Sequence, residues 1–422
     1  MSSNPKTGIH LPKLLLSLRR ETHYNTLFQV GGFLGSEFGM VIRVFSTLGH
    51  FHSSVVSSLV GEQPSYLNAG QRVALLDGIK GIAACVIVGH HLSEFSPSAG
   101  LANQFALNLM YGIYNYGLFI VHLFFVFGGF ALAMAMPDET ISWRKAFSYF
   151  GTRYVRLAAP YLVMLFLLVA VSWSALGRTM EPPLIDSFSW SQLLAHVFFL
   201  QDVLGYGNLS AGTWYLCIDL QYVGLFLMIQ ALLNTVGKVT RQDLDGPVAV
   251  SAVLIPLGLV SVWYWNRILE YEVFVFYFLG PLVLGSLIAW TLKGKISWWV
   301  LVFYATAMMA SLAIEFRPRV LVGLGSGLLL VACIRFWRTF PIPSPILWLG
   351  KVSYSLFLIH YLVNGIVLNG LDPWIGSSPS RAFAALPIAF LASLVAAAGL
   401  YYWVEAPCDR FLKSLRKNRC HP

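Results

Sequence analysis

Ten runs of about twenty mostly apolar residues recur along this chain of 422 residues, and each is long enough to cross a bilayer as a helix. Hydrophobic residues make up 57% of the sequence and charged residues only 11%, where soluble proteins carry roughly 25%. This composition excludes a water-soluble or disordered protein and predicts an all-α, polytopic membrane helix bundle. The ten predicted spans are 73–92, 117–136, 157–176, 214–236, 247–265, 273–292, 296–314, 320–337, 352–371 and 383–403.

Basic residues predict how these spans are oriented. If the amino terminus lies in the cytosol, 23 of the 28 Lys and Arg residues fall in cytosolic segments and only five fall outside. Such a bias is expected for an even number of spans with both termini cytosolic. The formal net charge of +9 therefore reflects membrane topology, and no nucleic-acid partner is predicted.

The chain divides into three predicted parts. Residues 1–70 form a polar and amphipathic leader, partly interfacial and without a cleavable signal peptide; residues 71–412 form the membrane domain, and residues 413–422 form a basic cytosolic tail. The five cysteines are scattered and lack C-x-x-C spacing, so neither a disulfide framework nor a metal site is predicted.

Ionisable side chains inside spans are costly and are therefore functional candidates. Lys80 and His91 are eleven residues apart, which at about 100° per residue places them on one helix face, with Asp77 nearby and His90 turned well away. If Lys80 marks the cytosolic boundary, His91 lies about 16 Å deeper, near the midplane. A neutral imidazole there has the chemistry of a general base for a hydroxyl. The alternative is a histidine that serves only helix packing.

Arg153 and Arg156 are three residues apart, at the predicted cytosolic mouth of the third span. Two guanidinium groups side by side suit a phosphate-rich ligand that arrives from the cytosol. On these residues alone, anchoring to lipid headgroups is the favoured alternative, because every inner loop is basic. Asp219 lies about five residues inside the fourth span, where it either orients a histidine or pairs with a cation.

The ninth predicted span also carries polar groups. Ser353, Tyr354 and His360 occupy its first turns, and His360 is expected at a depth comparable to that of His91. Glu405 lies where the last span leaves the membrane, before Pro407, which we expect to end the helix. Glu405 is interpreted as architectural.

Two further residues carry weaker signals. His122 in the second span is a lone histidine among aromatic residues, which is typical of packing. Asn208 begins an Asn-Leu-Ser sequon in a predicted outer loop, where a glycan would confirm the orientation.

Five motifs, in order, resemble those of the acyltransferase-3 family of integral membrane O-acyltransferases, over about residues 70–412. They are similar to the family's Leu-Asp-Gly-Leu-Arg-Gly…His-His, Phe-Phe-x-x-Ser-Gly-Phe, Arg-x-x-Arg-x-x-Pro, Trp-x-Leu-x-x-Glu and Gly-x-x-Ser-Tyr-x-x-Tyr-x-x-His segments. Here they are found within residues 76–91, 123–132, 153–162, 213–222 and 349–360.

The resemblance implies transfer of an acyl group, usually acetyl from acetyl-CoA, to a hydroxyl. By position, His91 matches the family's essential histidine, and Arg153 and Arg156 match the pair assigned to the CoA phosphates. Lys80 stands where an arginine is usual, and Asp219 is one methylene shorter than the usual Glu. Two further departures are at His122, where Asp is common, and at Gly128, where Ser is common.

These residues and the resemblance together predict an acetyl-CoA-dependent membrane O-acetyltransferase, without a metal, in the endoplasmic reticulum or another endomembrane. We expect His91 to act as base with Asp219 as orienter, and Lys80, Arg153 and Arg156 to hold the donor. The membrane-only form resembles fungal members that acetylate lipophilic small molecules, terpenoids or meroterpenoids, in secondary metabolism. The alternative is a proton-coupled secondary transporter of a small metabolite, with His91, Asp219 and His360 as its proton path.

Overall fold

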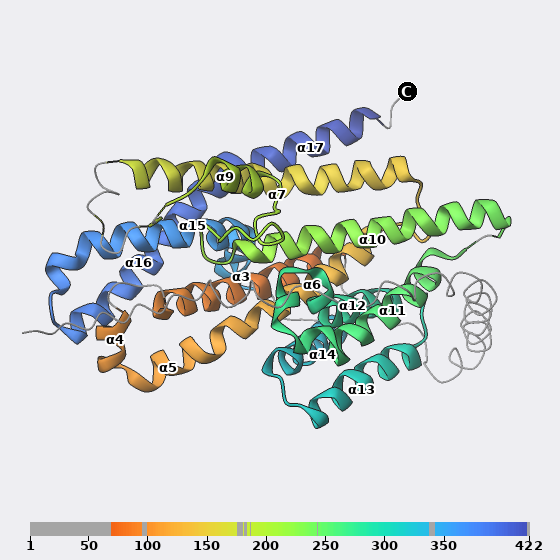
Figure 1. Ribbon diagram of the computed structural model, residues 1–422, viewed down its shortest axis with the longest axis horizontal. Coiled ribbons are helices and arrows are strands. Elements are labelled where there is room, and N and C mark those ends of the chain that lie inside the picture. The colour runs from red at the N-terminus through yellow and green to blue at the C-terminus, as the bar shows by residue number, and fades with distance from the viewer. Residues whose placement is uncertain are drawn as a thin grey trace, which may run out of the picture. The chain divides into compact units, whose positions relative to one another are not determined.

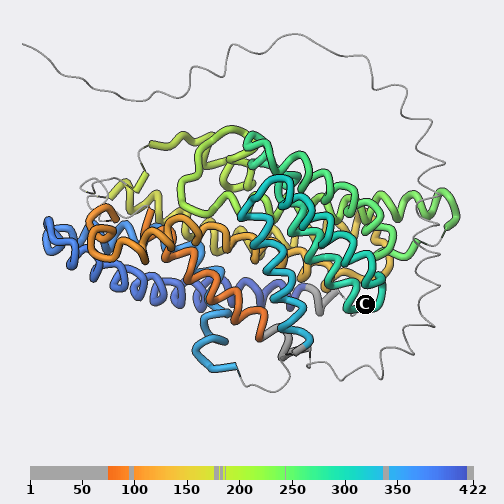
Figure 2. Tube along the Cα trace, turned by 90° about the horizontal axis from the view of Figure 1, so that it is seen from below, coloured from red at the N-terminus to blue at the C-terminus, as the bar shows by residue number. Residues whose placement is uncertain are grey.

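The computed structural model describes residues 69–94, 99–174, 180, 184–185, 187–242, 244–336 and 342–419. Nearly all of the leader predicted for residues 1–70 lies outside these ranges. The described residues are overwhelmingly helical, and their sole β-pairing is an isolated bridge between Glu139 and Asp245. Figure 1 and Figure 2 show long helices that run side by side in one bundle, which confirms the predicted all-α polytopic fold.

Each of the ten predicted spans corresponds to a helix in the described part of the chain. Within the described ranges, nine helical stretches are long and apolar enough to cross a membrane, and the helix that matches the remaining predicted span, α13, is apolar and 17 residues long. The longer helices are α3 (Ala69–Glu94), α5 (Leu107–Tyr116) continuing into α6 (Val121–Ala135), α7 (Trp143–Trp173), α10 (Thr213–Thr240), α11 (Gly246–Trp263), α12 (Val275–Leu292), α13 (Trp298–Ile314), α14 (Pro318–Phe336), α15 (Ser344–Ile375) and α16 (Pro379–Leu400). Shorter helices are α4 (Ala99–Phe105), α9 (Trp190–Val197) and α17 (Ala406–Arg419).

Two predicted boundaries are wrong in ways that matter for the site. α7 begins at Trp143 rather than near residue 157, so Arg153 and Arg156 lie well inside a helix of 31 residues. Pro407 does not end the last helix, because a π-helical turn (Tyr401–Glu405) leads directly into α17. Pro407, the second residue of α17, directly follows this turn, and a local π-helical adjustment is one way in which a membrane helix accommodates a proline that lacks an N–H.

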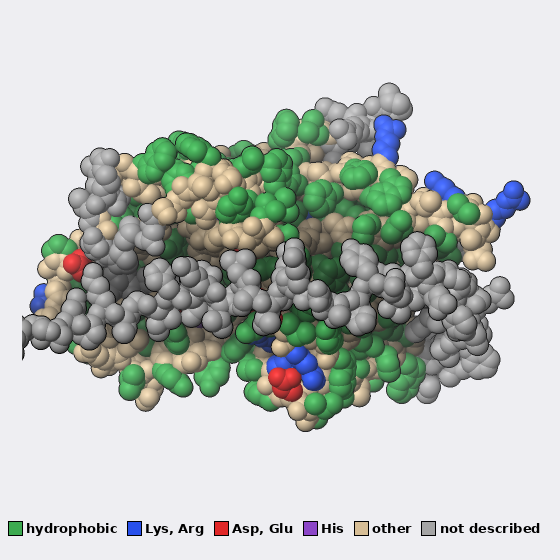
Figure 3. All heavy atoms as spheres, viewed as in Figure 1, with side chains coloured by type: hydrophobic (Ala, Val, Ile, Leu, Met, Phe, Trp, Pro, Cys, Tyr) green, Lys and Arg blue, Asp and Glu red, His purple; other side chains and the backbone are tan. Residues whose placement is uncertain are grey.

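The surface of the bundle is apolar where a soluble protein would be charged. Large side chains such as Phe166, Val395 and Trp403 are 70%, 75% and 83% exposed. Figure 3 shows patches of hydrophobic side chains across the described part of the visible face, with the few charged groups confined to small areas. Lipid is the solvent that makes such exposure favourable, so the protein is a multi-pass membrane protein.

Charged residues gather at the two ends of the helices. At one end Lys295 pairs with Asp138 at 3.0 Å, and we call this the basic end. At the other end Arg267 pairs with Glu315, and Arg319 pairs with Glu272. We call this the far end; the topology prediction places it outside the cytosol.

Glycines allow α3 and α15 to cross very closely. A Cβ added to Gly81 would lie 2.7 Å from the backbone nitrogen of Gly350, which is closer than van der Waals contact allows. Only a residue without a side chain fits at such a crossing. The crossing fixes the register of two helices that both run away from the basic end, and it determines which of their later side chains meet.

Candidate active site

His91 and His360 meet inside the bundle. Each lies ten residues beyond its crossing glycine, Gly81 or Gly350, so both rise about 15 Å along neighbouring parallel helices. Their rings stack with centroids 5.1 Å apart and an angle of 24° between the planes. His91 is 6% exposed and His360 is fully buried. The two histidines, expected at comparable depths, therefore lie side by side in the bundle, and their depth in the membrane stays a prediction.

The tautomer of His360 follows from its backbone contact. Its Nδ1 lies 3.2 Å from the carbonyl oxygen of Leu356, one turn earlier in α15, and a nitrogen beside a carbonyl must carry the proton. Nε2 then presents a lone pair, and this buried atom has no hydrogen-bond partner among the described residues. The histidine pair therefore contains a proton acceptor of defined orientation.

His90 faces a different helix, as its position on the helical wheel predicts. Its Nδ1 lies 3.3 Å from the carbonyl oxygen of Ile113, and its Nε2 lies 3.0 Å from the carboxylate of Glu94. Sequence reasoning missed Glu94, although the four-residue spacing from His90 is a recognisable signal for a pair on one helix face. The ligand atoms of His90, His91 and Glu94 lie within 4.8 Å of one another, a donor set that a divalent metal accepts. The absence of a metal remains a prediction from the sequence.

Arg153 is held by a two-pronged ion pair with Asp219 on α10. Its Nη2 donates to Asp219 Oδ2 at 2.8 Å, and its Nε donates to the same oxygen at 3.2 Å. Asp219 is buried, and Gly128 on α6 leaves room beside it, since a Cβ there would lie 3.7 Å from Oδ1. Of the two partners that the sequence left open for Asp219, the structure shows the cation. The Arg153 side chain is 37% exposed, and its Nη1 takes no part in these bonds.

Arg156 pairs with a different helix. Its Nε lies 3.0 Å from Asp409 on α17, and its side chain is 52% exposed, so both Nη groups remain available. Sequence reasoning did not find Asp409 as a partner, because it lies 253 residues after Arg156 and beyond a proline that was expected to end the helix. The two guanidinium groups are one helical turn apart, and each is anchored by its own carboxylate.

The remaining predicted polar residues make mostly structural contacts. Lys80 pairs with Asp77 on its own helix at 3.3 Å. Ser353 donates to the carbonyl of Gly350, and Tyr354 donates to the carbonyl of Leu157 at 2.7 Å, which ties α15 to α7.

Glu405 also joins two segments. It accepts a hydrogen bond of 2.7 Å from the hydroxyl of Ser355, and both groups are buried. This bond links the π-helical turn to α15, which agrees with the interpretation of Glu405 as architectural.

Asn208 lies in a compact network before α10. Its Nδ2 donates to Asp202 at 2.6 Å, and its Oδ1 accepts from Thr213 at 2.7 Å. Burial raises the pKa of the Asp202 carboxyl. Glycosylation at Asn208 would use the same Nδ2, and it stays a prediction.

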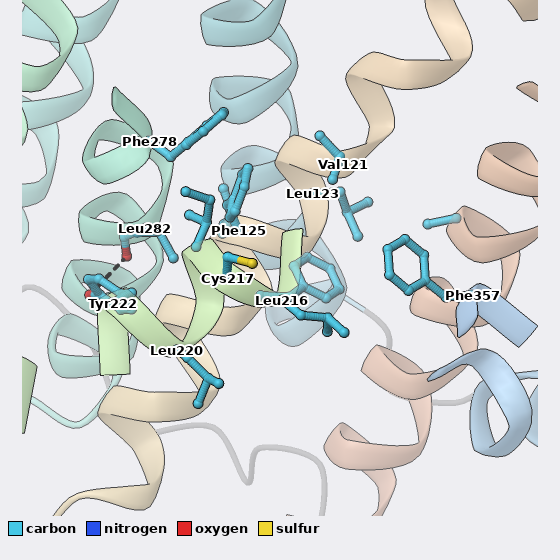
Figure 4. Close-up of a cluster of buried hydrophobic side chains, with 14 of the residues drawn as sticks. Val121, Leu123, Phe125, Leu216, Cys217, Leu220, Tyr222, Phe278, Leu282 and Phe357 are labelled. Atoms are coloured by element: carbon cyan, nitrogen blue, oxygen red, sulfur yellow. Dashed lines mark hydrogen bonds between the residues drawn. The ribbon is translucent and has the colours of Figure 1, made fainter. Parts of the chain in front are cut away.

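Aromatic rings lie next to both Asp219, the partner of Arg153, and the histidine pair. Tyr215, one turn before Asp219, packs edge-on against Phe357 with ring centroids 5.8 Å apart. The Phe357 and His360 ring centroids are 6.3 Å apart. Figure 4 shows Phe357 beside the larger cluster of buried side chains that contains Phe125 and Phe278. A chain of ring contacts therefore connects the surroundings of Asp219 with His360.

Comparison with protein families matches residues 73–402, more than three quarters of the chain, to the acyltransferase-3 model, described as an acyltransferase domain. The chain belongs to the acyltransferase-3 family. It is therefore an acyltransferase of the multi-pass membrane type, as the five motifs predict. Comparisons with curated proteins and with solved structures yield no match.

Proposed function

We propose that this acyltransferase moves an acetyl group from acetyl-CoA to a hydroxyl of a lipophilic small molecule. The observation that carries the proposal is the buried, stacked pair of His91 and His360 within a membrane acyltransferase domain. A dry imidazole stays neutral, and a neutral imidazole can accept a proton from an alcohol.

His91 acts as the general base in this proposal. It removes the proton of the acceptor hydroxyl while the oxygen attacks the thioester carbonyl, and the C–S bond breaks as the new ester C–O bond forms. The proton then passes to the departing CoA thiolate. Two imidazoles with centroids 5.1 Å apart cannot both carry a charge in a buried site, so the pair takes up one proton at a time. His360 supports the base by stacking on it.

The donor is held by Arg153 and Arg156, with Lys80 assisting. Asp219 fixes the orientation of Arg153. The Nη1 of Arg153 and both Nη groups of Arg156 remain able to bond phosphate oxygens. In this arrangement Asp219 positions the cofactor-binding arginine. The thioester arm of CoA then extends past Tyr215 and Phe357 to the histidines.

A terpenoid or meroterpenoid acceptor and an endoplasmic-reticulum or other endomembrane location complete the proposal. Both rest on the resemblance to fungal members of the family and on the apolar surroundings of the site. A transporter that moves protons along His91, Asp219 and His360 is less favoured, because the hydrogen bonds of Asp219 are made to Arg153.

The deciding experiment uses purified protein with acetyl-CoA and a lipophilic alcohol. Release of free CoA that depends on the alcohol supports the proposal, and uptake into proteoliposomes without CoA release supports the transporter. The His91→Ala variant should lose about 10²- to 10⁴-fold in turnover, the usual cost of removing a proton-transfer group. Near-normal turnover in a folded His91→Ala variant contradicts the role of base. A metabolite profile from cells that lack the gene identifies the acceptor as a species lighter by one acyl group.

A further inference from the structure

Two hydrogen-bond acceptors meet at the end of α3, beside the proposed base. His90 Nδ1 lies 3.3 Å from the carbonyl oxygen of Ile113 and therefore carries the ring proton, which leaves a lone pair on Nε2. This Nε2 atom lies 3.0 Å from a carboxylate oxygen of Glu94. Two acceptors at this distance repel each other unless a proton or a metal ion lies between them.

The geometry of this pair favours a metal ion over a proton. A proton shared by the two groups requires an aligned hydrogen bond, but His90 Nε2 is buried and has no hydrogen-bond partner among the described residues. A metal ion that is bound by both atoms lies to one side of the line between them, because the ligands of a tetrahedral ion meet it at an angle. The close but unaligned pair is therefore compatible with a shared metal.

His91 supplies a third ligand atom. Its ring lies next to that of His90, with centroids 5.2 Å apart, and the ligand atoms of His90, His91 and Glu94 all lie within 4.8 Å of one another. Bond lengths of about 2.0–2.2 Å place tetrahedral zinc ligands roughly 3.3–3.6 Å apart, so modest side-chain rotation brings all three atoms to one ion. The four-residue spacing of His90 and Glu94 is also the spacing at which one face of a helix holds zinc.

The surroundings hold His90 in the orientation of a metal ligand. Histidines that bind metals usually donate their other N–H to a carbonyl or a carboxylate, and the contact of His90 with Ile113 has this form. Gly117 packs directly against the same side chain, since a Cβ there would lie 2.8 Å from the His90 Cβ. His90 is 4% exposed, whereas the Glu94 side chain is 33% exposed, so an ion reaches the site past the carboxylate.

We propose that His90, His91 and Glu94 form a zinc site, and that bound zinc inhibits acyl transfer. Two imidazoles and one carboxylate suit zinc, whereas magnesium and calcium prefer oxygen ligands. Zinc takes the single lone pair of a neutral imidazole, so a zinc-bound His91 cannot accept the proton of the acceptor hydroxyl. The inhibition rests on the function proposed above, in which His91 is the base, but the binding of zinc does not. Zinc is an inhibitor here, and the prediction that acyl transfer itself needs no metal is unchanged.

The experiment measures binding of radiolabelled zinc to the purified full-length protein by equilibrium dialysis, after treatment with EDTA and removal of any histidine tag. Saturable binding that excess unlabelled zinc displaces and excess magnesium does not is the expected result. Glu94→Gln should weaken binding at least about tenfold, since even changes outside the ligands of a metal site cost about 10- to 100-fold. Glu270→Gln, the same change at an exposed residue of another segment, is the matched control and should bind like the wild type.

His90→Phe tests a second ligand and keeps a ring beside Gly117. It should weaken zinc binding as Glu94→Gln does, while its thermal unfolding shows that it remains folded. In the assay of CoA release, the zinc concentration that halves the rate should be at least about tenfold higher for Glu94→Gln than for the wild type and for Glu270→Gln.

The proposal is overturned if wild-type binding is not saturable, or if Glu94→Gln or His90→Phe binds zinc like the control. It is also overturned if zinc-loaded wild type releases CoA at its full rate. Absence of alcohol-dependent CoA release from the metal-free protein contradicts the proposed function and the inhibitory role with it, whereas the dialysis still decides whether the zinc site exists.

Discussion

The crossing of α3 and α15 makes a quantitative prediction about the histidine pair. In a Gly81→Ala variant the new Cβ would lie 2.7 Å from the Gly350 nitrogen, where ordinary contact begins at 3.4 Å. The new Cβ is bonded directly to the backbone and the Gly350 nitrogen is part of the backbone, so neither atom can rotate away. The helices must therefore separate by about 0.7 Å at the crossing. Such a shift is passed along rigid helices to His91 and His360, ten residues further on.

The expected cost follows from this shift. A misplacement of about 1 Å at a reacting group can reduce the rate about 10²-fold, so a separation of 0.7 Å should lower kcat between about tenfold and a hundredfold. Overpacking costs about 1–3 kcal/mol, partly offset by the gain of about 1 kcal/mol from replacing glycine by alanine in a helix. The variant should therefore be folded but less thermostable.

Gly89→Ala is the matched control, because it is the same change in the same helix. A Cβ at Gly89 would meet only the Ile113 side chain, at 3.7 Å, which is ordinary contact. This variant should be at least as thermostable as the wild type and should retain most of its kcat. The assays are CoA release and the midpoint of thermal unfolding of the purified proteins. Equal kcat for Gly81→Ala and the wild type, or equal damage in the two variants, would refute the reasoning.

Three further predictions concern charged and titrating groups. Asp219→Asn should raise the KM for acetyl-CoA at least about tenfold with a smaller effect on kcat, because it weakens the charge-assisted bonds that hold Arg153; an unchanged KM would show that the pair is only structural. His360 is proposed to support the base by stacking, so His360→Phe, which keeps a stacked ring but removes Nε2, should retain most of the wild-type kcat; a large fall in kcat at constant protein level would show a chemical role instead. Burial lowers the pKa of His196 from 6.5 to about 4, so the folded protein binds fewer protons than the unfolded chain in this interval. Stability should therefore be fully present above pH 6.5 and fall toward pH 4, and His196→Gln should flatten the melting profile over that range.

The number and position of the membrane helices were predictable from the sequence because they depend on local properties. A run of about twenty apolar residues must satisfy its own backbone hydrogen bonds in lipid, whatever it packs against. For the same reason the polar residues within these runs, such as His91 and Asp219, were recognisable as candidates. The common helix face predicted for Lys80 and His91 follows from helical geometry alone.

The helix ends were less predictable. Hydropathy placed the start of the third span at residue 157, but α7 begins fourteen residues earlier, because a helix can extend beyond its apolar run. Pro407 indicated a helix end and instead lies in the first turn of α17. The two segments carry Arg153, Arg156 and Asp409. The anchoring of the arginine pair was therefore not predictable from the expected helix ends.

The pairing of side chains was decided only by the tertiary structure. Arg153 lies 66 residues from Asp219, and His91 stacks on a histidine from a helix near the other end of the chain. Helix packing in lipid depends on close contacts between small residues such as Gly81 and Gly350, and the sequence does not say which helix each small residue meets. Hydropathy therefore determined which segments cross the membrane, and the crossings of the helices decided which side chains are buried in the bundle and which of them meet.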